Sequence, residues 1–355
     1  MTRFSQYTLL LAATIALCPF ASHAAQAPLH SPWDAQPIAL THAAYTCPDP
    51  PPFSKSIDAD SYYSDAHHSI VDPKALEAER NATEAPTHLG EWATQAADAY
   101  RTHGSSAAAA CVYALLDAAA RAHAWAGSMP TPQGSYEQKW LLASVSVAYL
   151  KVRLSGAGSP DQEKEIRRWL DTVATSAIDY VERKESNPES DAWNNHRYWA
   201  GLAVCAAGIA TGDRSDYEWG IASYKAGVDR IQPDGALPRE MARAGRALHY
   251  HIYALAPLVM IAELAEANGL DLYSYKNGAI HRLVRVCISG LEDPGIFGKA
   301  TGVLQEDADV TSGAYIGWAV PYVKRFPDAQ LSAWIAHAHE TSFWQWGGLP
   351  PGAGS

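Results

Sequence analysis

The chain has 355 residues, of which 48 % are hydrophobic, so it is long enough to bury the core of one large domain or two small ones. Its formal net charge of −11 at pH 7 argues against a general nucleic-acid binder, whose surface is normally basic. Twelve Trp and eighteen Tyr against six Phe have two interpretations: flat rings with polar edges bind sugar rings, and they also pack ordinary cores.

Residues 1–24 have the pattern of a secretory signal. Arg3 supplies the positive start, residues 9–20 form an apolar run, and residues 22–24 form a small-x-small cleavage site. The apolar run is too short to cross a bilayer, and we find no longer apolar segment downstream. The sequence therefore predicts a soluble, exported protein with no membrane partner.

Residues 25–72 are rich in proline and predict an extended segment. Cys47 lies in this segment, and export permits a disulfide to the helix that carries Cys111. Cys205 and Cys287 lie in apolar helical contexts and are as easily free core thiols. Because no pair of cysteines has the short spacing of a zinc site, the sequence predicts no metal and no cofactor.

From Asp72 onward the sequence predicts one helix after another. Asp72 is a good N-cap before Pro73, and the residues from Ser159 to Gln162 form a capping-box pattern. We expect roughly eleven helical segments at ordinary helix lengths, and no alternating strand pattern. Breaks are expected at residues 104–106, 127–134, 156–160, 187–188, 211–213, 232–235, 269 and 293–295. A bundle, a solenoid and a closed helical toroid all fit, although no fixed repeat supports the solenoid.

Two segments carry residues suited to chemistry. In residues 191–199, Asn195 and His196 come near a helix start, where exposed N–H groups favour anions. In residues 239–253, Arg246 and Tyr253 are seven apart and share one helical face. Taken singly, the two segments also fit a capped helix start and an amphipathic helix. Taken together with the nearby Trp residues, they predict a site for an acidic sugar.

Residues 194–200, followed by residues 237–240 and 246–255, resemble the alginate lyases of polysaccharide lyase family 5. These are periplasmic mannuronate lyases of Gram-negative bacteria. Lys139, Trp140, Cys47, Cys111 and residues 267–272 are also similar to family positions. The resemblance implies an all-α fold, an incomplete α/α toroid over residues 73–346 with a deep substrate groove and a lid-like loop before it. Residues 347–355 are expected to form a flexible tail.

The resemblance implies a catalytic set of Asn195, His196, Arg246 and Tyr253, and metal-free β-elimination. The first three would neutralise the uronate carboxylate and stabilise an enolate-like state. Tyr253 would remove the C5 proton and protonate the departing O4, which lie on one side of the ring in β-mannuronate. Since a free Tyr has a pKa near 10, we expect Arg246 and a nearby imidazole to favour the phenolate.

Further residues are expected to contact an anionic polysaccharide along the groove. They are Lys139, Trp140, Arg239, Tyr62, Tyr63, Trp199 and Tyr250. Positive charge in the groove is expected from Lys139, Arg197, Arg239, Arg243 and Arg246, inside an otherwise acidic protein that is expected to be a monomer.

Two segments depart from the family pattern. In residues 61–68 a family Lys is absent and His occupies the family Arg position, and residues 343–347 lack a family Arg before Gly-Gly. The groove therefore loses positive charge and gains aromatic surface. Because mannuronate and glucuronate differ only at C2, a broader lyase acting also on polyglucuronate or hyaluronan is the alternative. His67 and His68 add the hypothesis that substrate preference changes with pH.

Two other functions are open at this point. A glycoside hydrolase needs two carboxylates flanking the bond, and Asp191, Asp234 and Glu240 are candidates without a distinctive spacing. A non-catalytic polysaccharide-binding or polymer-export protein would need no catalytic set. His249 with His251, and His337 with His339, are two apart and do not share a helical face, so neither pair predicts a metal site.

Overall fold

The computed structural model describes residues 27–353, and the predicted signal segment at residues 1–24 lies outside them. Within that range the chain is helical, with isolated β-bridges but no β-strand. The helices are α1 (Pro73–His103), α2 (Ser106–Arg121), α3 (Pro132–Val152), α4 (Pro160–Glu182), α5 (Asn195–Thr211), α6 (Arg214–Val228), α7 (Pro238–Met241), α8 (Ala247–Glu266), α9 (Tyr275–Glu292), α10 (Gly295–Thr301), α11 (Gly313–Ile316), α12 (Ala319–Arg325) and α13 (Ala329–His337). Short 3-10 turns are η1 (Asp191–Trp193), η2 (Ala244–Arg246) and η3 (Trp344–Trp346).

Side-chain caps begin the helices where the sequence predicts them. Asp72 accepts hydrogen bonds from the second and third N–H groups of α1, which starts at Pro73. Ser159 and Gln162 form the predicted capping box of α4. The predicted breaks up to residue 295 fall at or between helix ends. The shorter helices beyond that point carry fewer local signals.

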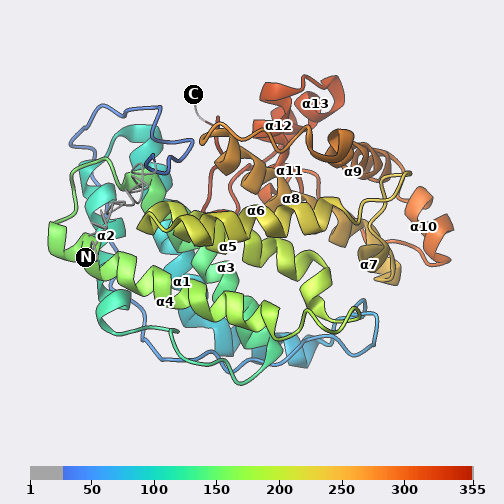
Figure 1. The fold of residues 1–355 in the computed structure, drawn as a ribbon, viewed down its shortest axis with the longest axis horizontal. Helices are drawn as coiled ribbons and strands as arrows, with labels where there is room; N and C mark the ends of the chain where they lie inside the picture. The colour runs from blue at the N-terminus through green and yellow to red at the C-terminus, as the bar shows by residue number, and fades with distance from the viewer. Residues whose placement is uncertain (1–26, 354–355) are drawn as a thin grey trace, which may run out of the picture.

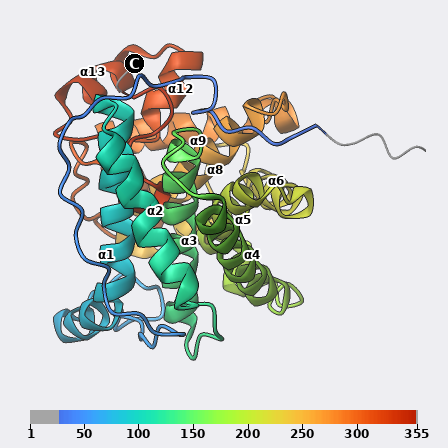
Figure 2. The same ribbon diagram turned by 90° about the vertical axis from the view of Figure 1, so that its left-hand side faces the viewer.

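The long helices form two layers (Figures 1 and 2). Helices α1, α3, α5 and α8 pack side by side in chain order, and α2, α4, α6 and α9 cover them from outside. The row ends at α8, and η3 packs against α1 and α3. Helices α3, α5 and α8 are buried on nearly every face, whereas α4 keeps an exposed polar face. This is the incomplete α/α toroid that the resemblance implies.

A glycine allows α5 and α6 to approach closely. A Cβ atom on Gly220 would lie 2.4 Å from the Cβ of Cys205 on α5. Gly201 on α5 is equally constrained, because a Cβ there would lie 2.7 Å from the Cβ of Ser223. The close contact with α6 fixes α5, the helix whose first two residues are Asn195 and His196.

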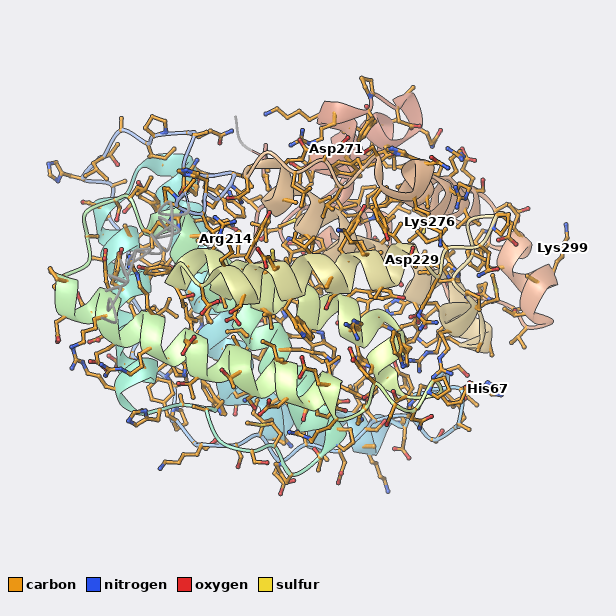
Figure 3. The ribbon with its side chains drawn as sticks, in the orientation of Figure 1. His67, Arg214, Asp229, Asp271, Lys276 and Lys299 are labelled. Atoms are coloured by element: carbon orange, nitrogen blue, oxygen red, sulfur yellow. A yellow bond between two sulfur atoms is a disulfide. The ribbon has the colours of Figure 1, made fainter. Side chains whose placement is uncertain are left out.

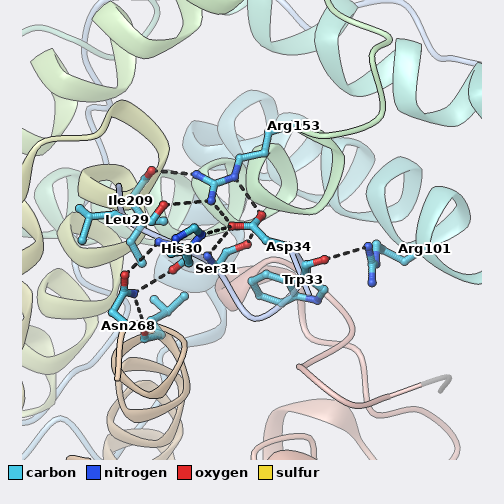
Figure 4. Close-up of polar contacts among 10 residues, drawn as sticks. Leu29, His30, Ser31, Trp33, Asp34, Arg101, Arg153, Ile209 and Asn268 are labelled. Carbon is cyan, nitrogen blue, oxygen red and sulfur yellow. Dashed lines mark hydrogen bonds and ion pairs between the residues drawn. The ribbon is translucent and has the colours of Figure 1, made fainter. Parts of the chain in front are cut away.

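The N-terminal segment is extended, as predicted, and is fastened across the helices. Arg153 at the end of α3 donates hydrogen bonds to Asp34 and to the carbonyl of Leu29, and His30 exchanges hydrogen bonds with Asn268 (Figure 4). Further along, the segment runs beside α1 and α2 (Figure 2). The predicted disulfide between Cys47 and Cys111 is present and joins it to α2.

Cys205 and Cys287 are free and buried. One helix of the described chain, Ala244–Glu266, is long and apolar enough to cross a membrane, which differs from our sequence analysis. Because 89 % of its apolar window is buried inside the fold, its hydrophobicity is accounted for by the core. At the C-terminal end, the carbonyl of Gly347 accepts a hydrogen bond from Lys151, and the N–H of Leu349 donates to Asp98.

Candidate active site

One large groove, with a volume of about 1290 Å³, is lined by residues from several helices and loops. Its walls come from the loop before α1, from α1 and α3, from the start of α5, from residues 239–253 and from η3. The predicted site residues that line it are Tyr62, Tyr63, Trp140, His196, Arg239, Arg246, Tyr250 and Tyr253. The fold thus brings together residues that lie far apart in sequence.

The start of α5 positions Asn195 and His196. Asn194 is the N-cap, and its side chain accepts a hydrogen bond from the N–H of His196. Asn195 is fully buried, and its backbone and side-chain N–H groups both donate to Glu240, at 2.7 and 3.0 Å. Its side-chain oxygen has no hydrogen-bond partner within the described chain. Asn195 does not line the groove directly, but lies at its wall next to His196.

His196 is held by an aromatic stack. Its ring lies 3.6 Å from that of Tyr136, with the two planes 13° apart. The Tyr136 hydroxyl donates to Asp191, which also accepts from Tyr180 at 2.6 Å and from Lys184 at 2.9 Å. Burial, followed by the charges of Lys139 and Arg243, holds the pKa of His196 well below its usual 6.5. The imidazole is therefore neutral in the free protein.

Lys139 and Trp140 take different positions although they are adjacent. Trp140 lines the groove and meets Tyr253 edge to face, with ring centroids 6.2 Å apart. Lys139 points into the protein, with its ammonium 4.2 Å from the Tyr136 ring centre and no hydrogen-bond partner within residues 27–353. Burial lowers the pKa of Lys139 to about 7. Lys139 therefore does not line the groove, and its ammonium is not placed to contact a substrate there.

Tyr253 lies in the groove between aromatic neighbours. Its hydroxyl donates a hydrogen bond of 2.8 Å to the side-chain oxygen of Gln345 in η3. Trp199, also predicted to bind substrate, is fully buried behind Tyr253 and donates from its indole N–H to the Tyr253 carbonyl. It supports the tyrosine from inside and does not line the groove. His249 stacks on the Tyr253 ring at 5.9 Å.

The protonation state of Tyr253 differs from our expectation. Burial is the largest effect on its pKa, and neighbouring Tyr62, Glu137 and other groups add to it, so the pKa lies well above 10. Arg246 does not offset this, because its Nε pairs with Glu306 at 2.9 Å and its Nη1 contacts the Tyr63 hydroxyl. The free protein therefore holds Tyr253 as a neutral phenol.

The loop before α1 closes over the groove. The Tyr63 hydroxyl hydrogen-bonds to that of Tyr250 at 2.8 Å, and the rings of Tyr62 and Tyr63 lie 4.5 Å apart. His67, labelled in Figure 3, has its Nδ1 3.0 Å from the carbonyl oxygen of Ala242, just after α7. His68 meets Tyr63 edge to face at 5.6 Å. The loop thus places aromatic rings next to Arg246.

Only part of the predicted positive charge reaches the groove. Arg239, Arg243 and Arg246 line it, whereas Arg197 pairs with Glu185 between the rings of Trp193 and Trp219. Sequence analysis missed other cations of the lining, namely Arg80, Arg183 and Lys184. The groove lining therefore carries cations, but in a different set from the predicted one, and Lys184 and Arg239 among them are paired with Asp191 and Glu189.

The candidate hydrolase carboxylates do not form a flanking pair. Glu240 is fully buried against Asn195, and Asp234 is exposed outside the groove lining. Asp191 lines the groove, but its charge is engaged by Tyr136, Tyr180 and Lys184. In the part of the chain that the structure describes, no group of three or more His, Cys, Asp or Glu side chains is arranged to hold a metal ion.

Comparisons with known proteins identify relatives of the chain. The alginate lyase family model matches residues 56–297. A polysaccharide lyase of Stenotrophomonas maltophilia is 40 % identical over 82 % of this chain and 85 % of its own length. An alginate lyase of Pseudomonas syringae pv. syringae (strain B728a) is 34 % identical over 77 % of this chain and 73 % of its own.

Solved structures share the fold. A histidine-to-alanine variant of alginate lyase A1-III, complexed with a tetrasaccharide, aligns with a TM-score of 0.75 at 23 % identity, over 91 % of this chain and 89 % of that one. Alginate lyase A1-III from Sphingomonas species A1 aligns with a TM-score of 0.73 at 25 % identity, over 86 % of both chains. These structural likenesses support the toroid.

Proposed function

The chain belongs to the alginate lyase family and is a polysaccharide lyase, and we propose that it cleaves 1,4-linked polyuronates by β-elimination, with poly-β-D-mannuronate as its main substrate. The products are oligouronates with a 4,5-unsaturated end. The observation that carries the proposal is the meeting of Tyr253, Arg246 and His196 in one groove. Trp140 lies 6.2 Å by ring centroids from both His196 and Tyr253, which supports a compact site.

The uronate carboxylate is the first group that this site must bind. Arg246 supplies a guanidinium and His196 an imidazole, and Asn195 lies behind His196 in the groove wall. Hydrogen bonds to the carboxylate neutralise its charge and stabilise the enolate-like state that forms when the C5 proton leaves. Glu240 fixes Asn195, and Tyr136 fixes the His196 ring, so both groups are already oriented before substrate arrives.

Tyr253 then carries out the proton transfers. As phenolate it takes the C5 proton, and as phenol it donates that proton to O4 as the glycosidic bond breaks. One residue serves both steps because C5–H and O4 lie on the same side of the mannuronate ring. Since the free protein holds the neutral phenol, Tyr253 must lose its proton before it acts as a base.

A broader polyuronate specificity is the second candidate. The aromatic lining by Tyr62, Tyr63 and Trp344 favours broad specificity, because ring faces pack against sugar rings without pairing with individual charged groups. Polyglucuronate and hyaluronan carry the same C4–C5 arrangement as polymannuronate. His68, beside Tyr63, is the group through which pH would change the preference.

Export and oligomeric state complete the proposal. The signal-like residues 1–24 support a periplasmic location, and the disulfide between Cys47 and Cys111 suits an oxidising compartment. We infer a monomer, because a single chain supplies every residue of the proposed catalytic set.

The test is an assay of the purified protein on polymannuronate, polyguluronate, polyglucuronate and hyaluronan. A lyase produces a conjugated double bond that absorbs ultraviolet light, whereas a hydrolase produces new reducing ends without that absorbance. We expect absorbance to rise fastest with polymannuronate. Reducing ends without absorbance, or no turnover of any polyuronate, would contradict the proposal.

A further inference from the structure

Two carboxyl groups outside the proposed catalytic set meet in the groove wall. Glu79 on α1 is 8 % exposed, and Glu137 on α3 is 5 % exposed. One side-chain nitrogen of Gln133 donates to both, at 3.4 Å to Glu79 and 2.8 Å to Glu137. All three residues line the groove. Because one nitrogen joins them, the two carboxyl groups belong to one site.

The pair holds a single negative charge. Two buried carboxylates that share one donor repel each other, so one of them keeps its proton. Burial, together with the charge of Glu79, holds the pKa of Glu137 well above its usual range, so the proton is on Glu137. Burial also raises the pKa of Glu79, but hydrogen bonds from Glu137 and Gln133 lower it, so Glu79 is the member of the pair that carries the charge.

The pair lies beside the reacting groups. Glu137 and Trp140 lie one turn apart on α3, and the Trp140 ring centroid is 6.2 Å from those of both His196 and Tyr253. A sugar bound against Tyr253 and Trp140 therefore lies in the same groove as Glu79 and Glu137.

An unused donor lies on the same face of α3 as Glu137. Trp140 follows Glu137 by one turn of α3 and lines the groove at 7 % exposure. Its indole N–H is buried and has no hydrogen-bond partner among the residues described. Buried polar groups are normally hydrogen-bonded, so this donor indicates a ligand atom. A donor and an acceptor together fit a hydroxyl, which accepts one hydrogen bond and donates another.

We propose that Glu79, Glu137 and Trp140 form a hydroxyl-binding subsite, in which a ring hydroxyl of a uronate donates to Glu79 and accepts from the Trp140 indole. This inference rests on the proposed function and deepens it. A carboxylate in the same place would meet the negative charge of Glu79. The subsite therefore selects the C2–C3 hydroxyl edge of the sugar and leaves the carboxylate to Arg246.

Isosteric substitutions test the subsite. Glu79→Gln removes the anionic acceptor, and we expect KM for polymannuronate to rise about tenfold with kcat nearly unchanged. Glu137→Gln imitates the protonated carboxyl, since its amide accepts from Gln133 and donates to Glu79, so we expect KM to rise less than it does in Glu79→Gln. If the two residues had a purely structural role, Glu137→Gln would have the larger effect, because Glu137 is the more buried residue. Thermal unfolding of each variant verifies that it folds.

The matched control is Glu77→Gln, which makes the same charge change at an exposed position of α1. It leaves KM unchanged or slightly lowered, because it removes one negative charge from the surface only. A KM for Glu79→Gln that equals or falls below that of Glu77→Gln would overturn the proposal.

A chemical probe tests which group of the substrate is bound. Acetylation of the O2 and O3 hydroxyls of polymannuronate removes the donor, so it raises KM for the wild type. In Glu79→Gln the same acetylation raises KM only slightly, because the hydrogen bond from the hydroxyl to Glu79 is already lost. Equal effects of acetylation in both proteins would contradict hydroxyl binding. These outcomes are separate from the proposed function, which fails only if the wild type does not turn over polyuronates.

Discussion

The phenol of Tyr253 donates a hydrogen bond of 2.8 Å to the side-chain oxygen of Gln345, which links the inner helix α8 to the C-terminal turn η3. An accepting partner favours the protonated phenol, as does the burial of the ring. The proposed general base is therefore protonated in the free protein, and it becomes active when a higher pH or the bound substrate favours loss of the proton. This relationship governs the pH dependence that we expect.

We predict that kcat rises with pH across the neutral and mildly alkaline range. The active base is the phenolate, whose fraction grows about tenfold per pH unit while the pH is below the pKa of Tyr253. The raised pKa places that rise on the alkaline side. Initial rates of product absorbance at saturating polymannuronate measure it. A kcat that falls steadily from pH 7 to pH 9 in a folded enzyme would contradict this assignment.

Gln345→Glu should move the pH profile of kcat further toward alkaline values. A carboxylate beside the phenol disfavours the phenolate, so the rate at neutral pH should fall about tenfold or more and recover as the pH rises. Gln330→Glu on α13 makes the same charge change at an exposed position and serves as the control. If the two variants share the wild-type profile, Gln345 does not act on Tyr253.

Asp191→Asn should weaken both the fold and the stack under His196. Burial is the largest single effect on the pKa of Asp191 and raises it. The hydrogen bonds from Tyr136, Tyr180 and Lys184 together outweigh burial, so the pKa lies below 3.8. We expect a loss of about 1–3 kcal/mol in the free energy of unfolding at pH 7, and a lower kcat.

The stability difference between the wild type and Asp191→Asn should depend on pH. Because the pKa in the fold is depressed, the contribution is fully present above the unfolded value near 3.8 and is lost as the pH falls through the lower folded value. Denaturant unfolding at pH 7 and in the acid range measures the difference. A gap that stays constant down to the acid limit of the fold would argue against the charged role of Asp191.

Reduction of the Cys47–Cys111 disulfide should lower the thermal midpoint while leaving activity at low temperature. The bond ties the N-terminal segment to α2 across 64 residues of sequence, and removing such a cross-link costs about 2–5 kcal/mol. Thermal unfolding with and without a reducing agent tests this. The Cys47→Ser/Cys111→Ser variant should be insensitive to the reductant, and equal midpoints for the oxidised and reduced wild type would disagree with the prediction.

Local signals made much of the fold predictable. Caps such as Asp72 and Ser159 act on N–H groups within three residues, so their effect can be read without tertiary structure. The same reasoning predicted the start of α5 at Asn195. After residue 295 the helices are short, and α10, α11 and α12 have no side-chain cap, whereas Asp328 caps α13.

The orientation of side chains on buried helices was harder to predict. Lys139 and Trp140 are neighbours on α3, but successive residues point about 100° apart, so only Trp140 faces the groove. Because α3 and α5 are buried on nearly every face, their hydrophobic pattern does not mark a groove side, and Trp199 was misassigned for that reason. Gln345 and Glu79 reach the site only through long-range packing.

The measurement that bears most directly on the account is turnover of polymannuronate by Tyr253→Phe, followed by ultraviolet absorbance of the unsaturated product and by binding of the polymer to the same variant. The substitution removes only the hydroxyl that performs both proton transfers. We predict binding close to that of the wild type and a loss of turnover of at least about 10²–10⁴-fold. A folded Tyr253→Phe protein that cleaves the polymer at a near-normal rate would contradict the central claim.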